Sequence, residues 1–587
     1  MCGIIGYIGN NRASTILLKG LVNLEYRGYD SVGIAVLNSS GIEYRKGAGK
    51  INEVSNKLNF LGLDGRIGIA HNRWATHGKV TDNNAHPHFD CSKTIAIVHN
   101  GIIENYRELK EKLSGHKFSS ETDSEVIAHL IEEAIGEGMS FEDAFLHAIS
   151  QLEGSYAVLA IKAGEEKILA ARKGSPLVLG VADHGTFLAS DIPSFIEWTK
   201  KVIYLHDYDV VVATRDEIRF YNLIEGEVFR PLDTVEWDAE QAKKGGFEHY
   251  MLKEITEQSE TIQRALQQDE RIVAKIVDEM RKAQGIFFVG CGSSYHACLT
   301  GSYLFSKIAG EHVNVVLASE FENYEHFLTD KTLVFAVSQS GETADVLEAV
   351  RAAKQHGSKV ISLVNVMGSS LMRESDEFLL MNAGPEICVL STKTYTSQVA
   401  LMNLLAHALI GKYDEGVSKL KSLYMDIYNL TSKAMREHLK GLAEKLAGKE
   451  HIYLIGRGLQ YATALEAALK IKEVSYIHAE AFAGGELKHG PLALIEDGTP
   501  VIVFVAEENE KKIVSNAEEV KARGGYIVGV SAGRHDVFDY WIKVPESGDL
   551  NPIVQVIPMQ ILSYELAVLR GLNPDKPRNL AKSVTVT

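Results

Sequence analysis

The chain has few cysteines, lacks a basic charge balance and contains no long apolar run. Its 587 residues include only five cysteines and no Cys-x-x-Cys pair, a usage that favours a reducing, cytoplasmic setting over secretion. Lys and Arg number 61 against 77 Asp and Glu, and the formal net charge of −16 argues against general nucleic-acid binding. We find no apolar run near the roughly 18 residues that a membrane span needs, and no basic and apolar leader before Cys2. The composition predicts a soluble cytoplasmic protein that binds neither nucleic acid nor membranes.

The length predicts about three or four domains, because a single hydrophobic core rarely serves so long a chain. Residues 1–235 contain short alternating runs such as GIAVLN (33–38) and SYAVLAI (155–161), which predict a strand-rich domain. One helical pattern, SEVIAHLIEEAI (124–135), interrupts these runs. The polar, Gly-containing stretch at 236–255 is typical of a linker. Strand–helix alternation after it predicts parallel sheets with crossover helices.

The second half contains a weak internal repeat. FFVGCGSSYHA (287–297) and YLIGRGLQYAT (453–463) each combine an apolar strand, Gly-x-Gly and the start of a helix. This repeat predicts two related open α/β domains. We therefore expect a strand-rich domain, a linker, two α/β domains and a C-terminal tail, at 2–235, 236–255, 256–435, 436–572 and 573–587.

The N-terminus MCGIIGYIG places a cysteine directly after the initiator methionine. Removal of that methionine would give Cys2 a nucleophilic thiol and a free α-amino group on one residue. An α-amino group has a pKa near about 8, so it can act as the base for the neighbouring thiol. This arrangement is typical of a nucleophile that attacks an amide.

Four polar stretches in the first half could complete such a site: HNRWATHG (71–78), NAHPH (84–88), HNGIIEN (99–105) and ETDSE (121–125). Asn100 and the Gly101 N–H could stabilise an oxyanion, Arg73 and Asp123 could bind a carboxylate and an ammonium, and Trp74 could act as a lid. Simpler interpretations also exist. Asn–Gly commonly marks a hairpin, and Asp123 could cap the helix that follows.

His86 and His88 raise the question of a metal site. No cluster of Cys, His and Asp has the spacing of metal ligands, so we expect hydrogen-bonded histidines and no metal.

Together, MCGIIGYIG, RWATHG, NAHPH, HNG and TDSE make residues 2–235 resemble the class II glutamine amidotransferases. These are N-terminal-nucleophile (Ntn) hydrolases with an αββα sandwich. The resemblance implies that Cys2 attacks the side-chain amide of L-glutamine, that its α-amine is the base, and that Asn100 and Gly101 hold the oxyanion. It also implies a glutamine-binding set: Arg73, Trp74, Thr76, His77, His86 and Asp123.

In the second half, GCGSS (290–294), SQSGET (338–343) and VLSTKTYTSQ (389–398) each bring hydroxyl groups to a strand-to-helix turn. Helix N-termini of this kind suit a phosphate, and the serines favour a phosphosugar over a dinucleotide. Glu466, Lys470 and Glu473 share one helix face, and on spacing alone a solvated, salt-bridged stripe is the more common outcome. GGELKHGPLAL (484–494) predicts a tight turn after a histidine.

These pieces resemble tandem sugar isomerase (SIS) domains, and together with the first half they cover essentially the whole chain. The resemblance implies two doubly wound parallel-sheet domains that bind fructose 6-phosphate, aminate it with ammonia from glutamine and isomerise it to glucosamine 6-phosphate. Lys582 would form a Schiff base with the C2 ketone, His489 would open the sugar ring in a neighbouring subunit, and Glu473 would move the proton between C1 and C2. The implied sugar-phosphate set is Cys291, Gly292, Ser293, Ser294, Ser338, Gln339, Ser340, Thr343, Val389, Ser391, Lys470 and Ala581.

The resemblance also implies that no cofactor or metal takes part, that ammonia passes through a channel gated near Trp74, and that the SIS domains form a homodimer. Three alternatives stay open. An amidophosphoribosyltransferase would need an acidic pyrophosphate-binding loop, which we do not find. A glutaminase could serve another acceptor, or the SIS half could be a phosphosugar sensor.

Overall fold

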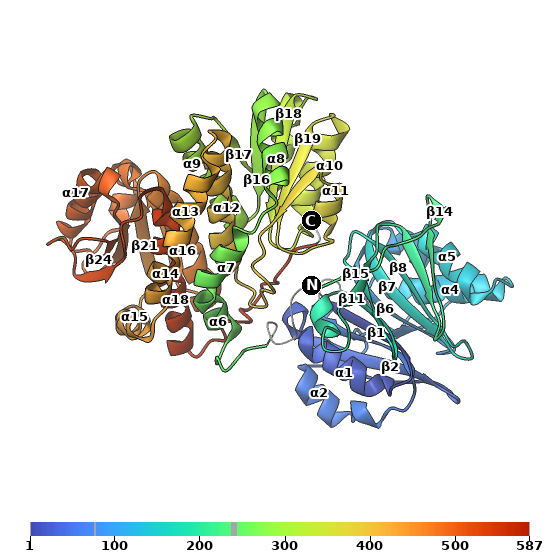
Figure 1. Ribbon diagram of the computed structural model, residues 1–587. Helices are drawn as coiled ribbons and strands as arrows, with labels where there is room; N and C mark the ends of the chain where they lie inside the picture. The colour runs from blue at the N-terminus through green and yellow to red at the C-terminus, as the bar shows by residue number, and fades with distance from the viewer. Residues whose placement is uncertain (1, 75–77, 236–242, 586–587) are drawn as a thin grey trace. The chain divides into compact units, whose positions relative to one another are not determined.

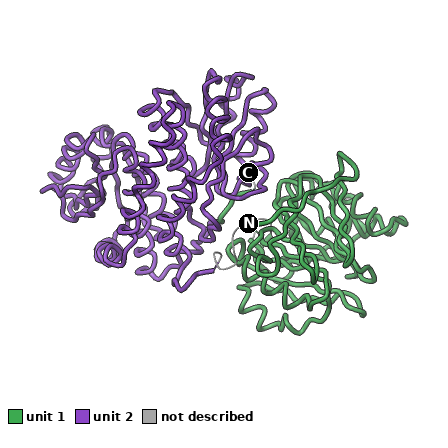
Figure 2. The backbone as a smooth tube through the Cα atoms, viewed as in Figure 1, with its two compact units in different colours: residues 1–242, 581–587 green, residues 243–580 purple. Residues whose placement is uncertain are grey.

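The computed structural model describes residues 2–74, 78–235 and 243–585, and the chain divides into two compact units (Figure 1, Figure 2). Unit 1 comprises residues 1–242 and 581–587, and unit 2 comprises residues 243–580. Each unit is described by itself below.

Unit 1 contains two antiparallel sheets. The first sheet follows the order β15 (Asp233–Thr234), β11 (Lys201–Tyr204), β9 (Val178–Ala182), β10 (Gly185–Ala189), β1 (Gly3–Gly9), β4 (Ile67–Arg73), β2 (Ser31–Asn38) and β3 (Gly41–Ala48). The second follows the order β14 (Gly226–Glu227), β13 (Ile218–Asn222), β12 (Asp209–Ala213), β8 (Ile168–Lys173), β7 (Gly154–Lys162), β6 (Ile95–Ile103) and β5 (His88–Phe89).

Alternation along the strands builds the layers of unit 1. In β6, Ala96 and Val98 face the first sheet and join a core shared by both sheets, while Ile95 and Ile97 face the helices on the other side. Those helices are α3 (Tyr106–Lys112), α4 (Glu125–Gly136) and α5 (Phe141–Ser150). On the outer face of the first sheet, α1 (Ala13–Asn23) packs on β1 and β4, and α2 (Ile51–Lys57) lies beside α1. The expected αββα sandwich is therefore present.

Unit 2 contains two parallel five-stranded sheets with the same topology. The first follows the order β17 (Asn314–Leu317), β16 (Gly285–Gly290), β18 (Thr332–Ser338), β19 (Lys359–Val364) and β20 (Glu377–Leu380). The second follows the order β22 (His478–Ala483), β21 (His451–Gly456), β23 (Pro500–Phe504), β24 (Tyr526–Ser531) and β25 (Tyr540–Lys543). The second strand of each lies at one edge, so both match the predicted doubly wound sheets.

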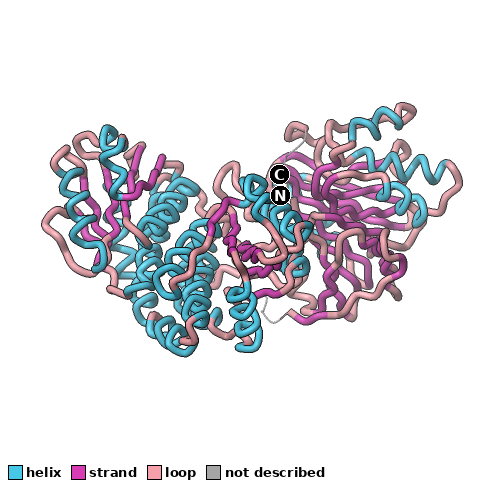
Figure 3. The backbone as a smooth tube through the Cα atoms, turned by 90° about the horizontal axis from the view of Figure 1, so that it is seen from above, coloured by secondary structure: helices cyan, strands magenta, loops and turns pink. Residues whose placement is uncertain are grey.

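Helices flank both sheets of unit 2 (Figure 3). They are α6 (Tyr250–Thr256), α7 (Gln258–Ala265), α8 (Glu270–Lys282), α9 (Ser293–Leu304), α10 (Ala344–Gln355), α11 (Ser370–Glu374), α12 (Lys393–Leu409), α13 (Tyr413–Ser422), α14 (Tyr424–Leu430), α15 (Lys433–Leu446), α16 (Leu459–Ser475), α17 (Glu510–Lys521) and α18 (Asn551–Leu569). One apolar cluster contains residues of both sheets and of α9, α12, α16 and α18, so the two repeats share a core.

The expected linker overlaps unit 2. Residues 236–242 lie outside the described residues, but α6 begins at Tyr250, and Met251 and Ile255 are fully buried in the unit 2 core. The domain boundaries given by the sequence remain predictions.

One long apolar helix among the described residues was not identified from the sequence. Gly548–Leu569 is long and apolar enough to cross a membrane by length and composition, with a mean hydropathy of 1.4. However, 89% of the 18-residue apolar window within this helix is buried inside the protein. The helix α18 packs against α15 and α16. This is the environment of a core helix, and core helices pass the same test.

Candidate active sites

Cys2 lies directly before β1, where the chain enters the middle of the first sheet of unit 1. Its Sγ accepts a hydrogen bond from the Trp74 N–H at 3.1 Å. Burial raises the pKa of the Cys2 thiol, while the Trp74 N–H and Arg73 act in the opposite direction. A base beside the thiol is therefore needed to form the thiolate, as the α-amine interpretation requires.

Asn100 and Gly101 lie inside β6 and pair with Ala157 and Tyr156 of β7. The hairpin interpretation of this Asn–Gly pair is therefore wrong. The Asn100 side-chain amide donates from Nδ2 to the Cys2 carbonyl at 3.0 Å, which places a donor beside the nucleophile's own residue. Gly101 has φ +128°, and a Cβ there would lie 2.0 Å from the Ser155 carbonyl oxygen, so only glycine fits.

Arg73 and Asp123 carry opposite charges and come from different elements. Arg73 ends β4, is almost completely buried, and donates to the carbonyls of Gly78 and Lys79, both at 3.2 Å. Burial lowers the pKa of Arg73, and the negative charges of Cys2 and Asp123 oppose that change. Arg73 interacts with both the Cys2 thiol and the Asp123 carboxylate, and such a cation and carboxylate suit the two charged ends of an amino acid.

Asp123 does not cap α4. Its Oδ2 accepts the Ile103 N–H at 2.8 Å, while Ser124 occupies the cap position without a side-chain capping bond. The alternative role as a helix cap is therefore wrong, and Asp123 is fixed to the end of β6. Trp74 packs edge-on against Tyr29, with ring centroids 5.5 Å apart. Thr76 and His77 lie outside the described residues.

His86 belongs to a buried group of histidines rather than forming an ordinary hydrogen-bonded pair. Its ring stacks on His71 at 4.0 Å and meets His88 edge-on at 4.3 Å. Among the described residues, neither ring nitrogen of His86 has a hydrogen-bond partner, so the expectation of a hydrogen-bonded histidine is wrong here. Burial lowers the pKa of His71 to about 3 and that of His86 well below its usual value. Both rings are therefore neutral.

In unit 2, two open helix N-termini meet at the edge where parallel strands end. Strands β16 and β18 are neighbours, and α9 and α10 follow them at Ser293 and Ala344. Neither helix has a side-chain cap, so backbone N–H groups remain available for an anion. This edge is the topological switch point of the sheet, where open α/β folds bind ligands.

The Gly-x-Gly turns confirm the internal repeat at the backbone level. Gly292 precedes α9 with φ 54° and ψ −125°, and Gly458 precedes α16 with φ 57° and ψ −127°. No other residue type adopts this conformation without strain.

The face formed by Glu466, Lys470 and Glu473 is directed into the protein. Glu466 and Lys470 are fully buried, so the solvated-stripe interpretation is wrong. Lys470 Nζ lies 2.7 Å from Glu473 and 3.4 Å from Glu466. Burial acts to lower the pKa of Lys470, but the two carboxylates outweigh it and the pKa is raised. The lysine is therefore a permanent cation within this cluster.

Ser293 connects this cluster to the first repeat. Its hydroxyl donates to Glu466 Oε1 and accepts from Lys470 Nζ, both at 2.9 Å. His296, one turn further along α9, lies 2.8 Å from the other oxygen of Glu466. A single polar cluster thus joins α9 of one repeat to α16 of the other.

The SQSGET turn uses its hydroxyls in two ways. Ser338 is buried; its hydroxyl accepts the Gly341 N–H and lies 3.0 Å from the Thr343 hydroxyl, so it shapes the turn. Gln339, Ser340 and Thr343 are half-exposed at the helix start. These three are the side chains of the turn that remain accessible to a ligand.

The remaining predicted sugar residues in unit 2 lie at the starts of α9 and α12. Ser294 accepts a hydrogen bond from Gln398 of α12 at 3.1 Å, and burial raises the pKa of Cys291 to about 11. The Val389 N–H donates to the Asp575 carbonyl at 3.3 Å, and the Ser391 hydroxyl lies 2.6 Å from that of Thr394.

His489, Ala581 and Lys582 are not brought to the Ser293 cluster within unit 2. His489 is exposed at the end of a short 3₁₀ segment, Gly484–His489, and the predicted turn follows it at Gly490. Among the described residues, it forms no hydrogen bond or ion pair with that cluster. Ala581 and Lys582 belong to the segment grouped with unit 1, so their place in the sugar site remains a prediction.

The equivalent edge of the second repeat is acidic. Where the first repeat has SQSGET, the second has Glu507 and Glu508, followed by Glu510 at the start of α17. Three carboxylates at a helix N-terminus disfavour phosphate. The structure therefore favours one anion site per chain.

Sequence reasoning missed three features. Glu466 carried no individual role, and Glu386 was not noticed, although its carboxylate accepts the N–H groups of Thr392 and Thr394 at 2.9 and 3.2 Å. The third feature is a group of four potential metal ligands in unit 1, Cys91, His116, His129 and Glu132. His129 and Glu132 stand three residues apart on a predicted helix, and this spacing was the available signal.

The αββα sandwich of unit 1 and the two parallel sheets of unit 2 define the class of glutamine amidotransferases that carry tandem SIS domains. The sequence matches the glutamine amidotransferase domain family over residues 71–197 and the SIS domain family over residues 279–408 and 445–570. It is 48% identical over 601 residues to the glutamine–fructose-6-phosphate aminotransferase [isomerizing] of Thermococcus kodakarensis and 44% identical over 614 residues to that of Clostridium acetobutylicum, in each case across 100% of both chains. The chain belongs to the glutamine–fructose-6-phosphate aminotransferase (isomerizing) family.

Solved structures agree with this assignment for the second half. The C-terminal domain of a glucosamine-fructose-6-phosphate aminotransferase from Francisella tularensis matches with TM-score 0.53 and 34% identity, covering 57% of this chain and 99% of that one. A tagatose-6-phosphate ketose/aldose isomerase from Escherichia coli matches with TM-score 0.51 and 18% identity, covering 57% of this chain and 96% of that one. The latter similarity concerns the fold alone.

Proposed function

We propose that this chain converts D-fructose 6-phosphate and L-glutamine into D-glucosamine 6-phosphate and L-glutamate. The observation that carries this proposal is the bond from Lys470 to Ser293. It joins the two SIS repeats at a hydroxyl-rich switch point, in a protein whose other unit carries the proposed glutaminase nucleophile.

At the glutaminase site, the Cys2 thiolate attacks the side-chain amide carbon of glutamine, with its α-amine taking the thiol proton. Asn100 and the Gly101 N–H hold the oxyanion, the C–N bond breaks and ammonia leaves. Water then hydrolyses the thioester to glutamate and restores the thiol. Arg73 and Asp123 bind the α-carboxylate and α-ammonium, beside Trp74, Thr76, His77 and His86.

At the sugar site, the helix N-termini of α9 and α10, with Ser340, Thr343 and Gln339, bind the phosphate. Lys582 forms an imine with the C2 ketone, ammonia displaces the lysine, and Glu473 carries a proton from C1 to C2. Lys470 lies 2.7 Å from Glu473 and stabilises the carboxylate that takes the proton from C1 and that is restored once C2 has received the proton.

His489 would act in a neighbouring copy, because it is exposed on the second repeat while the phosphate site lies on the first. We therefore propose a homodimer formed through the SIS domains. Mixing His489→Ala with Lys582→Ala protein tests this directly. In an isologous dimer, one site of each mixed dimer regains both residues, and about a quarter of wild-type activity should return. Activity that stays at the level of the separate variants would contradict shared sites.

A coupled assay tests the reaction itself. Purified protein with a processed N-terminus should release glutamate and form glucosamine 6-phosphate in equal amounts, and fructose 6-phosphate should stimulate both. Lys582→Ala should abolish amino-sugar formation, whereas Lys472→Ala, at an exposed position of α16, should not. Glutamate release that ignores the sugar, with no amino sugar formed, would leave a glutaminase with a phosphosugar sensor. We place the activity in the cytoplasm because of the sparse, unpaired cysteines.

A further inference from the structure

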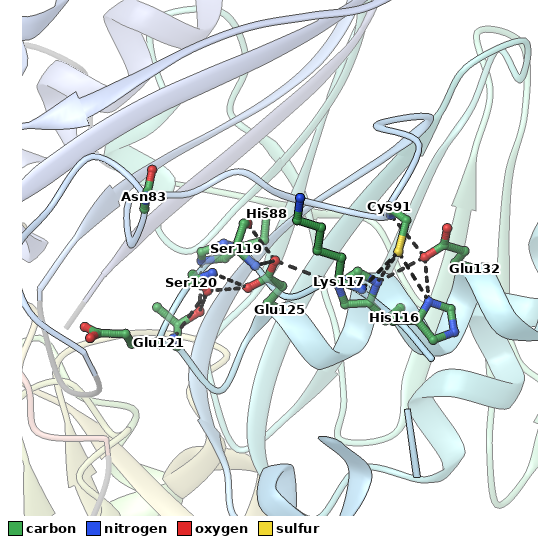
Figure 4. Close-up of polar contacts among 12 residues, drawn as sticks. Asn83, His88, Cys91, His116, Lys117, Ser119, Ser120, Glu121, Glu125 and Glu132 are labelled. Carbon is green, nitrogen blue, oxygen red and sulfur yellow. Dashed lines mark hydrogen bonds and ion pairs between the residues drawn. The ribbon is translucent and has the colours of Figure 1, made fainter. Parts of the chain in front are cut away.

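Four side chains with metal-binding atoms lie close together in unit 1. The proposed reaction uses none of them. Cys91 lies in the turn between β5 and β6, His116 in the loop after α3, and His129 and Glu132 on α4. One donor atom of each lies within 4.8 Å of all the others. Figure 4 shows Cys91, His116 and Glu132 directed toward one another.

The distances fit a single tetrahedral metal ion. Cys91 Sγ lies 3.6 Å from His116 Nδ1 and 3.8 Å from His129 Nδ1. Metal–sulfur and metal–nitrogen bonds of about 2.3 and 2.0 Å, at tetrahedral angles, place such atoms about 3.5 Å apart. Glu132 Oε2 lies 2.8 Å from His116 Nδ1 and 3.0 Å from His129 Nδ1, so it needs to move only slightly to share an ion with them.

The surroundings hold the donors in place. His129 and Glu132 are three residues apart and share one face of α4, and the His129 side chain is fully buried. Behind it, Glu125 Oε1 lies 3.7 Å from His129 Nε2, which is too long for a hydrogen bond but places a negative charge beside the imidazole. Glu125 is itself fixed by the N–H groups of Ser119 and Ser120, both at 2.7 Å.

The cysteine is equally suited to this role. The Lys117 N–H points at Cys91 Sγ from 3.4 Å, as in sites where backbone amides stabilise a thiolate. Cys91 is exposed, which gives an ion a path from solvent. Zinc accepts thiolate sulfur, imidazole nitrogen and carboxylate oxygen as ligands, and four protein ligands make a closed, structural site.

We propose that Cys91, His116, His129 and Glu132 bind one zinc ion per chain. The ion ties the β5–β6 turn and the loop after α3 to α4. Because Asp123 and Ser124 immediately precede α4, the ion also stabilises the segment that holds the proposed ammonium anchor of the glutamine site.

Metal titration of the full-length protein tests the proposal. A Cys2→Ala background removes the proposed nucleophilic thiol as a competing ligand. After chelation and exchange into metal-free buffer, this protein should bind one equivalent of Zn²⁺. Co²⁺ in its place should give the intense visible bands of a tetrahedral site and a thiolate charge-transfer band.

Matched variants locate the ion. Glu132→Gln should weaken Zn²⁺ binding, and His116→Ala should weaken it more than the roughly 10- to 100-fold that loss of an outer-shell partner costs. Glu133→Gln, at the exposed neighbouring position of α4, and His147→Ala, exposed on α5, should bind as the parent does. Cys91→Ser should abolish the charge-transfer band.

Two results would overturn the proposal: less than one equivalent bound by the parent, or unchanged affinity in both His116→Ala and Cys91→Ser. His116 lies in a loop, so its replacement leaves α4 intact and separates loss of a ligand from loss of folding. Because the readouts are metal content and absorption, they are independent of whether the chain aminates fructose 6-phosphate.

Discussion

The ammonium of Lys470 lies 2.9 Å from the hydroxyl of Ser293 and joins α16 of the second SIS repeat to the first turn of α9 in the first. Lys470 is fully buried together with Glu466, and Ser293 is nearly so. Water cannot replace a missing partner at such a place, so the charges there must be mutually compensated. The stability of unit 2 and the proposed sugar chemistry therefore depend on the same side chains.

Replacing Lys470 with Met should destabilise unit 2 strongly. The change leaves Glu466 and Glu473 without their cation, and losing one member of a buried ion pair costs about 3–5 kcal/mol. Denaturant unfolding should show this loss of stability as a lower denaturant concentration at the midpoint. The double variant Glu466→Gln/Lys470→Met should recover part of the lost stability. Lys472→Met, exposed on the same helix, is the control; an equal midpoint for the two lysine variants would refute the argument.

Replacing Asn100 with Ala should slow glutamine hydrolysis without weakening glutamine binding. The Nδ2 donor lies beside the nucleophile, and losing one oxyanion donor costs about 10²–10³ in kcat. Steady-state glutamate release measures both parameters. Asn83→Ala changes an exposed asparagine of the same unit and should match wild type. A rise in KM with unchanged kcat would assign Asn100 to substrate binding instead.

Unit 1 should lose stability on mild acidification. Burial lowers the pKa of His71 to about 3, and burial also lowers the pKa values of His86 and His88. In the unfolded chain each histidine titrates near about 6.5, so below that pH the unfolded state binds protons that the folded state excludes. The free energy of unfolding should fall by about 1.4 kcal/mol per pH unit for each histidine, and should be insensitive to these groups above about pH 6.5.

Between about pH 6.5 and 5 the pH dependence of stability reports mainly on the histidines, because the carboxylates titrate at lower pH. Denaturant unfolding across this window should give a shallower slope for His88→Gln, by about 1.4 kcal/mol per pH unit. Glutamine can keep the hydrogen bond that His88 Nε2 shares with Thr122 at 3.0 Å. An unchanged slope would mean that His88 takes up its proton in the folded state.

Most of the fold could be predicted from local sequence patterns. Gly292 and Gly458 could be matched from the sequence because strand, Gly-x-Gly and helix are contiguous, and the structure gives them nearly identical backbone angles. The alternation of β6 likewise follows from its own residues. The sequence left alternatives open where the structural role of a residue depends on a partner far away in the chain. Asn100 and Gly101 could not be told from a hairpin until β7 paired with them.

Burial was the main quantity that sequence could not provide. The Glu466–Lys470 face has the spacing of a surface stripe, and only its packing against α9 makes it internal. Cys91 is 25 residues from His116 and 38 from His129 in sequence, so their meeting depends on how α4 lies beside the β5–β6 turn. Neither fact follows from local propensity.

Each chain should bind one equivalent of fructose 6-phosphate rather than two, although it contains two SIS repeats. The first switch point offers uncapped helix N-termini and half-exposed hydroxyls, whereas the second carries Glu507, Glu508 and Glu510. Calorimetric titration measures the stoichiometry. Ser340→Ala should weaken binding by about 10-fold or more, the value of a hydrogen bond to a charged group. Arg457→Ala should leave affinity unchanged, because its guanidinium is directed to Asn516 at 3.0 Å rather than to a ligand. Two equivalents, or a loss of affinity in Arg457→Ala alone, would place sugar phosphate on the second repeat.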